Sequence, residues 1–211
     1  LIAINKKPGD IVQADKTEDA PLSDFVKAFI KHKYNKPGDV FLGTIHRLDR
    51  PTSGVVLFAK TSKALSRMNE QFKNKEVQKT YWAVVDNAPA NSFGTLDNCL
   101  QKNEKENKSY VTKAGQGKQA VLDYKLLKKL DNFYLLEIKP KTGRHHQIRV
   151  QLANIGCIIK GDLKYGAKRS NKDASIHLLA QKLEFIHPVT KQAITIIAPA
   201  PKESVWEACN K

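Results

Sequence analysis

Residues 46–59 of the chain read HRLDRPTSGVVLFA, a polar segment that runs directly into an apolar one. The unbroken apolar run Val55–Ala59 predicts a central strand that is covered on both faces of its sheet. Asp49 is the only carboxylate of the segment, and it lies between Arg47 and Arg50. Nearby positive charge keeps a carboxyl group ionised, and an ionised carboxylate on a turn at a sheet edge can act as a nucleophile or a base. A surface ion pair is the ordinary alternative.

Apolar periodicity on both sides of this segment predicts interleaved strands and helices. The predicted strands cover residues 1–5, 79–85, 119–130, 133–138, 182–186 and 193–198, and the predicted helices cover residues 21–33, 62–72 and 143–154, with a short helix starting near residue 203. Short turns join several of the strand pairs. This order favours an α+β fold with a mixed, mostly antiparallel β-sheet flanked by helices, and not a doubly wound parallel sheet.

Residues 97–118 are polar, rich in lysine and poor in large apolar side chains. Such a stretch is typical of a long hairpin or of a mobile loop, and a disordered insert is the alternative. The sequence leaves these possibilities open.

The charge balance narrows the class of partner. The 211 residues carry a formal net charge of +15 at pH 7, with a pI of about 9.7. Such a charge attracts polyanions, most commonly the phosphate backbone of nucleic acids. An anionic membrane is the competing partner, but no apolar run approaches the roughly 20 residues that span a bilayer. We therefore expect a nucleic acid as the partner and no membrane.

The cysteines Cys99, Cys157 and Cys209 are scattered along the chain, with no CxxC spacing. Neither a structural zinc site nor a disulfide framework is expected, and the predicted location is the reducing cytoplasm. The chain begins at Leu1, inside a predicted strand and without an initiating Met, so we expect further residues upstream in the natural protein.

Residues 142–149 read TGRHHQIR, which places polar side chains in the first turns of the helix predicted over residues 143–154. The apolar stripe of that helix consists of Ile148, Leu152 and Ile155. Arg149 lies beside this stripe, and a buried arginine needs an acidic partner because an unpaired buried charge is costly. Asp49 is one candidate for this partner, and a surface acid is the alternative.

Four stretches of the chain form a set. They are residues 46–54, KTY at 79–81, TGRHHQIR at 142–149, and GD at 161–162 with YG at 165–166. Tyr81 follows Asp49 by 32 residues, and Arg149 follows it by 100 residues. In order and spacing this set resembles the motifs of the RluA-type family of pseudouridine synthases, which modify ribosomal and transfer RNA. The resemblance covers roughly residues 1–200.

The resemblance implies roles for four residues. Asp49 matches the catalytic aspartate, and Arg149 matches the basic residue that pairs with it. Tyr81 matches the active-site tyrosine that stacks on the target base and is placed to take part in proton transfer. Arg47 matches the arginine that enters the RNA stack where the target uridine leaves it.

We also expect His46, Arg50, Arg144 and His145 to belong to the substrate-binding region. His46 is expected to support the loop that carries Asp49, without a chemical role. His145 departs from the family, which often has Thr or another small or aromatic residue there; we expect it to cap the start of the helix, with RNA contact as the alternative. His146 matches the family and is expected to be structural.

Pseudouridine formation breaks the bond between ribose C1′ and uracil N1, turns the ring and rejoins it through C5. Because the reaction has no redox step and transfers no external group, no cofactor and no metal are expected. The carboxylate could attack the sugar or the base, or remove a proton, and the sequence leaves these routes open. The target base must leave its stack to be reached.

The predicted function is therefore an RNA uridine isomerase, with large-subunit ribosomal RNA as the expected substrate and transfer RNA as the alternative. A catalytically silent RNA-binding module and an aspartyl hydrolase that releases uracil are the competing functions. Many family members carry an S4-type RNA-binding domain, which is not recognisable here, so either the protein lacks it or it lies outside these residues. We expect residues 1–211 to form a single catalytic domain, monomeric and without a protein partner.

Overall fold

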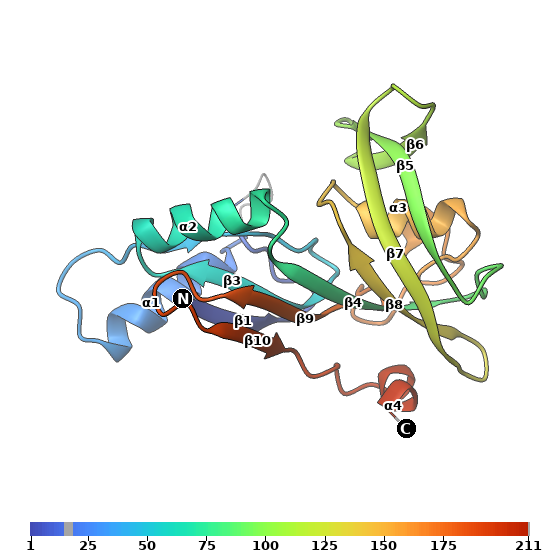
Figure 1. Ribbon diagram of the computed structural model, residues 1–211. Helices are drawn as coiled ribbons and strands as arrows, with labels where there is room; N and C mark the ends of the chain where they lie inside the picture. The colour runs from blue at the N-terminus through green and yellow to red at the C-terminus, as the bar shows by residue number, and fades with distance from the viewer. Residues whose placement is uncertain (15–18, 211) are drawn as a thin grey trace.

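A ten-stranded β-sheet dominates the computed structural model, which describes residues 1–14 and 19–210 (Figure 1). Its strands are β1 (Ile2–Lys6), β2 (Gly43–Thr44), β3 (Ser53–Ala59), β4 (Gln78–Val85), β5 (Phe93–Asn103), β6 (Lys108–Thr112), β7 (Lys118–Lys129), β8 (Tyr134–Pro140), β9 (Leu178–Ile186) and β10 (Ala193–Ile197). The helices are α1 (Leu22–Lys33), α2 (Ser62–Lys73), α3 (Gln147–Asn154) and α4 (Ser204–Asn210), with one 3-10 turn, η1 (Leu163–Tyr165).

The strand order is β1-β3-β9-β4-β8-β7-β5-β6, with β2 beside β3 and β10 beside β9. Among the described residues, neighbouring strands run antiparallel except for β3 and β9, which are parallel. This confirms the predicted α+β fold with a mixed, mostly antiparallel sheet.

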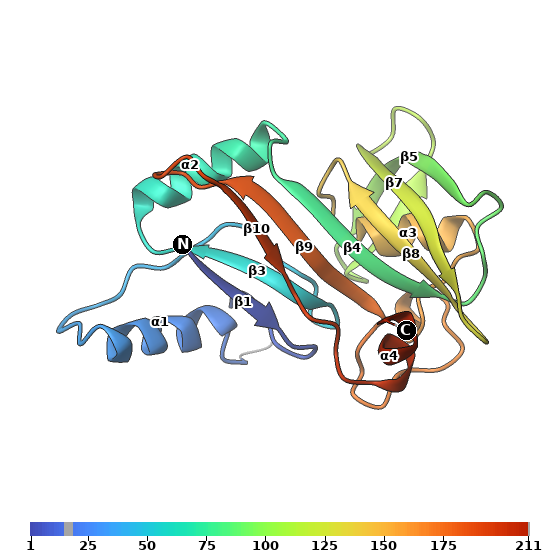
Figure 2. The same ribbon diagram turned by 60° about the horizontal axis from the view of Figure 1, so that its bottom comes forward.

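Strand β3 is buried along its whole length, which confirms the predicted central strand. Val55 and Leu57 pack with Met68 of α2, whereas Val56 and Phe58 pack against α1 on the other face. Figure 2 shows the two helices on either side of this strand. The apolar residues that follow the Asp49 segment therefore fix that segment to the middle of the molecule.

Gly54 allows β3 to come close to β9 immediately after the Asp49 segment. Its φ angle is +116°, and a Cβ atom there would lie 2.3 Å from the carbonyl oxygen of Ala180 on β9. Only glycine adopts this conformation without strain and leaves room for the neighbouring backbone.

The molecule has two halves that diverge from the middle of the sheet. Figure 1 shows α2 above the half that contains β1, β3 and β9, and α3 beside β5 and β7 in the other half, with β4 and β8 between them. Leu152 of α3 is fully buried with Leu122 and Leu136 of the sheet. Burying a leucine side chain stabilises a fold by about 1.5–3 kcal/mol, so this contact anchors α3 firmly.

The predicted helix over residues 143–154 was wrong at its start. Helix α3 begins at Gln147, because His146 has a left-handed backbone with φ of 52°. The Gln147 side-chain oxygen accepts hydrogen bonds from the Thr142 hydroxyl at 2.7 Å and from the Arg144 amide at 3.0 Å, which holds the preceding residues in a turn. The apolar stripe was also wrong at Ile155, which lies beyond the helix and is exposed.

The lysine-rich residues 97–118 form a hairpin in which β5 pairs with β6, and not a long irregular loop. The other predicted helices and strands are confirmed, with ends that shift by a few residues; the largest shift is in β9, which begins at Leu178. Within the described part of the chain, no helix has the length and apolar character needed to cross a membrane.

Candidate active site

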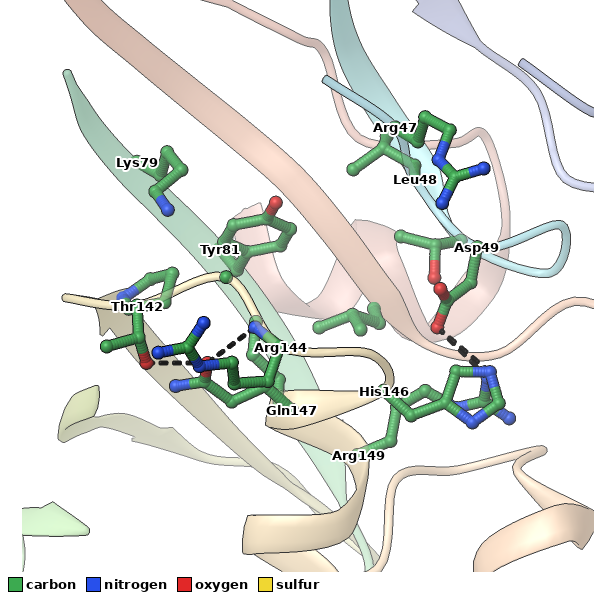
Figure 3. Close-up of a pocket in the computed structure, with 15 residues that line it drawn as sticks. Arg47, Leu48, Asp49, Lys79, Tyr81, Thr142, Arg144, His146, Gln147 and Arg149 are labelled. Atoms are coloured by element: carbon green, nitrogen blue, oxygen red, sulfur yellow. Dashed lines mark hydrogen bonds and ion pairs between the residues drawn. The ribbon is translucent and has the colours of Figure 1, made fainter. Parts of the chain in front are cut away.

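A pocket of about 140 Å³ lies where the segment before β3 meets β4, the end of β8 and the start of α3 (Figure 3). Its walls are formed by Arg47, Leu48, Asp49, Thr52, Lys79, Tyr81, Pro140, Thr142, Gly143, Arg144, His146, Gln147, Ile148, Arg149 and Leu178. Motifs that are far apart in the sequence, at residues 46–54, 79–81 and 142–149, thus meet around one cavity.

The turn that carries Asp49 is tied to β1. The Thr52 amide donates to the Asp49 carbonyl at 3.0 Å and closes the turn. Lys6, whose side chain is buried, donates from Nζ to the carbonyl oxygens of Arg50 at 3.0 Å, Thr52 at 2.7 Å and Lys7 at 2.9 Å. Three fixed acceptors for one ammonium group make this turn rigid.

Arg149 joins two carboxylates. Its Nη1 donates to Asp49 Oδ2 at 3.0 Å, while Nε and Nη2 donate to the two oxygens of Asp162 at 2.7 and 2.8 Å. The Asp162 side chain is 1% exposed and that of Asp49 is 30% exposed, so the buried acid anchors the arginine and the other acid faces the cavity. Burial alone would lower the pKa of Arg149, but the hydrogen bonds and charges of both acids raise it, so the guanidinium stays charged.

The second oxygen of Asp49, Oδ1, has no hydrogen-bond partner among the residues that the structure describes. One carboxylate oxygen is therefore held by the arginine and the other remains available. A fixed carboxylate with one unoccupied oxygen can attack an electrophilic carbon or accept a proton.

His146 lies beside this pair and is neutral. Its Nε2 is 3.6 Å from Asp49 Oδ2, and its Nδ1 is 3.0 Å from the Tyr165 hydroxyl. Burial, and then the nearby charge of Arg149, lower the pKa of His146 to about 2. The Tyr165 hydroxyl in turn accepts a hydrogen bond from the Ser109 amide at 2.9 Å, so the hairpin of β5 and β6 supports the site from behind.

Tyr81 faces the same cavity from β4. Figure 3 shows its ring and the Asp49 carboxylate on opposite sides of the pocket. Burial, and then the negative charge of Asp49, raise the pKa of Tyr81. The phenol is therefore protonated at neutral pH, and it offers a flat face and a hydrogen-bond donor to a bound ring.

The five residues predicted to bind substrate divide into two groups. Arg47 and Arg144 line the pocket. His46, Arg50 and His145 are outside its lining, and the exposed Arg50 forms an ion pair of 2.8 Å with Asp19.

His46 contacts β3 and α2 and lies away from the pocket lining. Its Nε2 accepts a hydrogen bond from the Leu57 amide at 3.1 Å, and its ring stacks on Phe72. Burial, and then the charge of Lys79, lower the pKa of His46 to about 4, so the ring is neutral and can accept this bond.

His145 does not cap the start of α3, so that expectation was wrong. Its Nδ1 lies 2.9 Å from the Ser109 hydroxyl, and the hydroxyl also donates to the His145 carbonyl oxygen. The start of α3 has no side-chain cap, and the side chain of Gln147 instead accepts the Arg144 amide of the preceding turn.

Asp162 and Lys6 received no role from the sequence. The stretch at residues 161–162 was part of the family resemblance and was the available signal for Asp162. No pattern distinguished Lys6 from its exposed neighbour Lys7, because its burial depends on tertiary contacts. Among the described residues, no group of three His, Cys, Asp or Glu side chains could hold a metal ion.

Comparison with known proteins gives a consistent result. The family model for RNA pseudouridylate synthase matches residues 1–154. An uncharacterised RNA pseudouridine synthase of Bacillus subtilis, YlyB, is 35% identical over 161 residues, which are 76% of this chain and 53% of the relative. Ribosomal large subunit pseudouridine synthase C of Rickettsia felis is 37% identical over 170 residues, 80% of this chain and 54% of the relative. The chain thus spans about half the length of these two proteins.

A third relative is matched over most of its length. The tRNA pseudouridine synthase C of Vibrio vulnificus is 34% identical over 229 residues, 98% of this chain and 89% of the relative. Among solved structures, human RNA pseudouridylate synthase domain containing 4 superimposes with a TM-score of 0.77 at 24% identity, covering 95% of this chain and 85% of the other. Human RNA pseudouridylate synthase domain containing 1 gives a TM-score of 0.68, so both share the fold.

Proposed function

Because the chain belongs to the RNA pseudouridylate synthase family, as its resemblance to RluA-type enzymes predicted, we propose that it converts uridine to pseudouridine in RNA. The observation that carries this proposal is the Asp49 carboxylate, which is held through Oδ2 by Arg149 at 3.0 Å and leaves Oδ1 available to the pocket. Residues 1–211 act in this proposal as one catalytic domain.

Asp49 supplies the reacting carboxylate. The bond between C1′ and N1 breaks, the ring turns, C1′ joins C5, and the proton of C5 is lost while N1 gains one. Attack on the sugar and attack on the base both require an ionised carboxylate. Arg149 holds the carboxylate by a charge-assisted hydrogen bond, and Asp162 keeps the guanidinium in place by accepting two more.

Tyr81 holds the ring while it is detached. Its aromatic face stacks on the uracil, and its protonated hydroxyl donates a hydrogen bond. The carboxylate and the phenol face each other across the pocket, so a uracil between them contacts both (Figure 3).

Arg47 assists the uridine in leaving its stack. The exposed side chain lies at the pocket wall next to Asp49. Extruding a base costs a few kcal/mol, and a planar guanidinium that fills the vacated position offsets part of this cost.

Large-subunit ribosomal RNA is the substrate that we propose, since relatives named for acting on it match up to 80% of the chain. Transfer RNA is the second candidate, because the transfer RNA enzyme of Vibrio vulnificus matches 98% of the chain and 89% of its own length. Transcripts of both kinds therefore belong in the assay.

The test is to treat each RNA with wild-type protein and Asp49→Asn, digest it to nucleosides and quantify pseudouridine. The wild type is expected to form pseudouridine, whereas the variant binds RNA and forms none. If the wild type releases free uracil in place of pseudouridine, the protein is a hydrolase. If the wild type binds RNA but forms neither product, the protein is a silent binding module. Turnover by Asp49→Asn would overturn the role of the carboxylate.

A further inference from the structure

A second and larger hollow, of about 520 Å³, adjoins the catalytic pocket. It lies between the end of α2, the first residues of β4 and the segment that follows β8, and we call it the α2–β8 groove. The two hollows share Lys79, Pro140, Thr142, Gly143 and Arg144. A chain that occupies the catalytic pocket can therefore continue into the groove without leaving the protein surface.

The α2–β8 groove is strongly cationic. Its lining includes the basic residues Lys73, Lys75, Lys79, Lys139, Lys141 and Arg144, with Asp123 as its acid. Lys141 pairs with Asp123 at 2.9 Å and Lys139 pairs with Glu137 at 3.1 Å. Within the part of the chain that the structure describes, the side chains of Lys73, Lys75 and Lys79 have no ion-pair partner.

Lys79 stands at the junction of the two hollows. It precedes Tyr81 by two residues on β4, and both side chains line the catalytic pocket. Its ammonium lies 4.0 Å from the position that a Cβ atom on Gly143 would take, next to the exposed Arg144. Figure 3 shows Lys79, Tyr81 and Arg144 on the side of the pocket opposite Asp49.

A half-buried ammonium without an acidic partner is unfavourable unless an anion binds to it. Because the groove is concave and opens into a pocket sized for a small ring, the matching anion is a phosphodiester of a strand whose base enters that pocket. A flat membrane surface could not reach Lys79 in this position.

We propose that the RNA strand on one side of the target nucleotide leaves the catalytic pocket through the α2–β8 groove. Lys79 and Arg144 bind the phosphate at the junction, and Lys73 and Lys75 bind phosphates further along. The inference rests on the proposed function for its choice of RNA as the ligand, but binding is measured without any turnover.

The experiment compares RNA binding by the wild type, the pair Lys73→Gln/Lys75→Gln and the matched pair Lys31→Gln/Lys63→Gln. Lys31 of α1 and Lys63 of α2 are exposed, as Lys73 and Lys75 are, but they lie outside the groove. The probe is a fluorescent RNA hairpin with a uridine-rich loop, titrated at several salt concentrations. Unchanged thermal unfolding midpoints establish that the variants are folded.

Each phosphate contact with single-stranded RNA contributes about 0.7 to the slope of log Kd against log salt. The groove pair is expected to lower the slope by about 1.4 and to weaken binding about tenfold near 0.1 M salt, with little change in the matched pair. Equal losses in both pairs would mean that only net charge matters and would overturn the proposal, as would a groove pair that binds like the wild type.

Lys79 is tested by Lys79→Gln and Lys79→Arg. The glutamine variant is expected to lose about 0.7 of the slope, and the arginine variant is expected to restore it because the charge is what binds the phosphate. If the slope does not change in Lys79→Gln, or is not restored in Lys79→Arg, Lys79 does not bind a phosphate at the junction. If the wild type and variants show the expected differences in slope but the wild type forms no pseudouridine in any RNA, the proposed function is wrong and RNA binding by the α2–β8 groove is still supported.

Discussion

Asp49 and Arg149, which are 100 residues apart in the sequence, form a hydrogen-bonded ion pair of 3.0 Å at the edge of the pocket. The arginine donates two hydrogen bonds to Asp162 and one to Asp49. A rigid, planar guanidinium can hold both acids at once, because its donors point in fixed and different directions. The geometry of the reacting carboxylate thus depends on a buried acid that does not face the pocket.

Arg149→Lys should therefore be a severe change although it keeps the charge. A lysine has a single ammonium group, which cannot satisfy both oxygens of Asp162 and also reach Asp49. We expect the free energy of unfolding to fall by about 1–3 kcal/mol, because charged hydrogen bonds to the buried Asp162 are lost, and pseudouridine formation to be lost. Urea unfolding and nucleoside analysis measure the two effects, and near-normal turnover in this variant would show that the bridge is dispensable.

Tyr81 is expected to have separable roles in binding and chemistry. Tyr81→Phe keeps the ring and should retain RNA affinity, while the lost hydroxyl lowers turnover by about 10²–10⁴-fold. Tyr81→Leu also removes the stacking face, which weakens RNA binding by about 1–3 kcal/mol. Single-turnover rates and fluorescence titrations separate the two effects. Full activity in Tyr81→Phe would leave only stacking to this residue.

The sequence singled out Asp49 and Arg149 but gave no role to Asp162, the buried acid that holds Arg149. Apolar runs identified β3 and the helix beneath Arg149, and the charge cost of a buried arginine required an acid. Asp162 was not assigned a role because it lies just before the short 3-10 turn η1, in a segment without apolar periodicity. The true start of α3 escaped because it depends on one side-chain contact of Gln147 and on the left-handed backbone of His146, and neither feature appears in an apolar pattern.

A substitution of Lys6 tests whether its hydrogen bonds to the turn that carries Asp49 are needed for stability and activity. Lys6→Met keeps the length of the side chain but removes the ammonium donor from three carbonyl oxygens, of which that of Arg50 keeps the Gly9 amide at 2.9 Å. We expect a loss of about 1–3 kcal/mol in unfolding free energy and a fall in kcat. Lys7→Met removes the same charge from an exposed neighbour and should change neither quantity appreciably. Equal behaviour of the two variants would show that the charge alone matters.

Gly54 can be compared with Gly9, since both have a positive φ, of +116° and +92°. Gly9→Ala meets no atom within 4 Å and should cost only the strain of an unfavourable backbone region, about 1 kcal/mol. Gly54→Ala places its methyl group 2.3 Å from the carbonyl oxygen of Ala180, so β3 and β9 must separate. We expect at least about 3 kcal/mol for this variant. Similar unfolding free energies for the two variants would mean that the strands separate without cost.

Neutral His146 predicts how stability depends on pH. The unfolded chain takes up a proton on this ring near pH 6.5, whereas the folded protein takes it up only near pH 2. Stability from this group is therefore complete above pH 6.5 and is lost as the pH falls below that value, by about 1.4 kcal/mol per pH unit. His46, with a pKa lowered to about 4, acts in the same direction.

The effect of His146 is isolated by comparing the wild type with His146→Gln in urea unfolding between about pH 6.5 and pH 5. The variant should lose less stability per pH unit than the wild type, by about 1.4 kcal/mol, because it has no ring to protonate. The comparison uses slopes, so any overall destabilisation of the variant cancels. Parallel pH profiles would show that the folded protein protonates His146 as readily as the unfolded chain does, and Asp49 would then have a second cation beside it in acid.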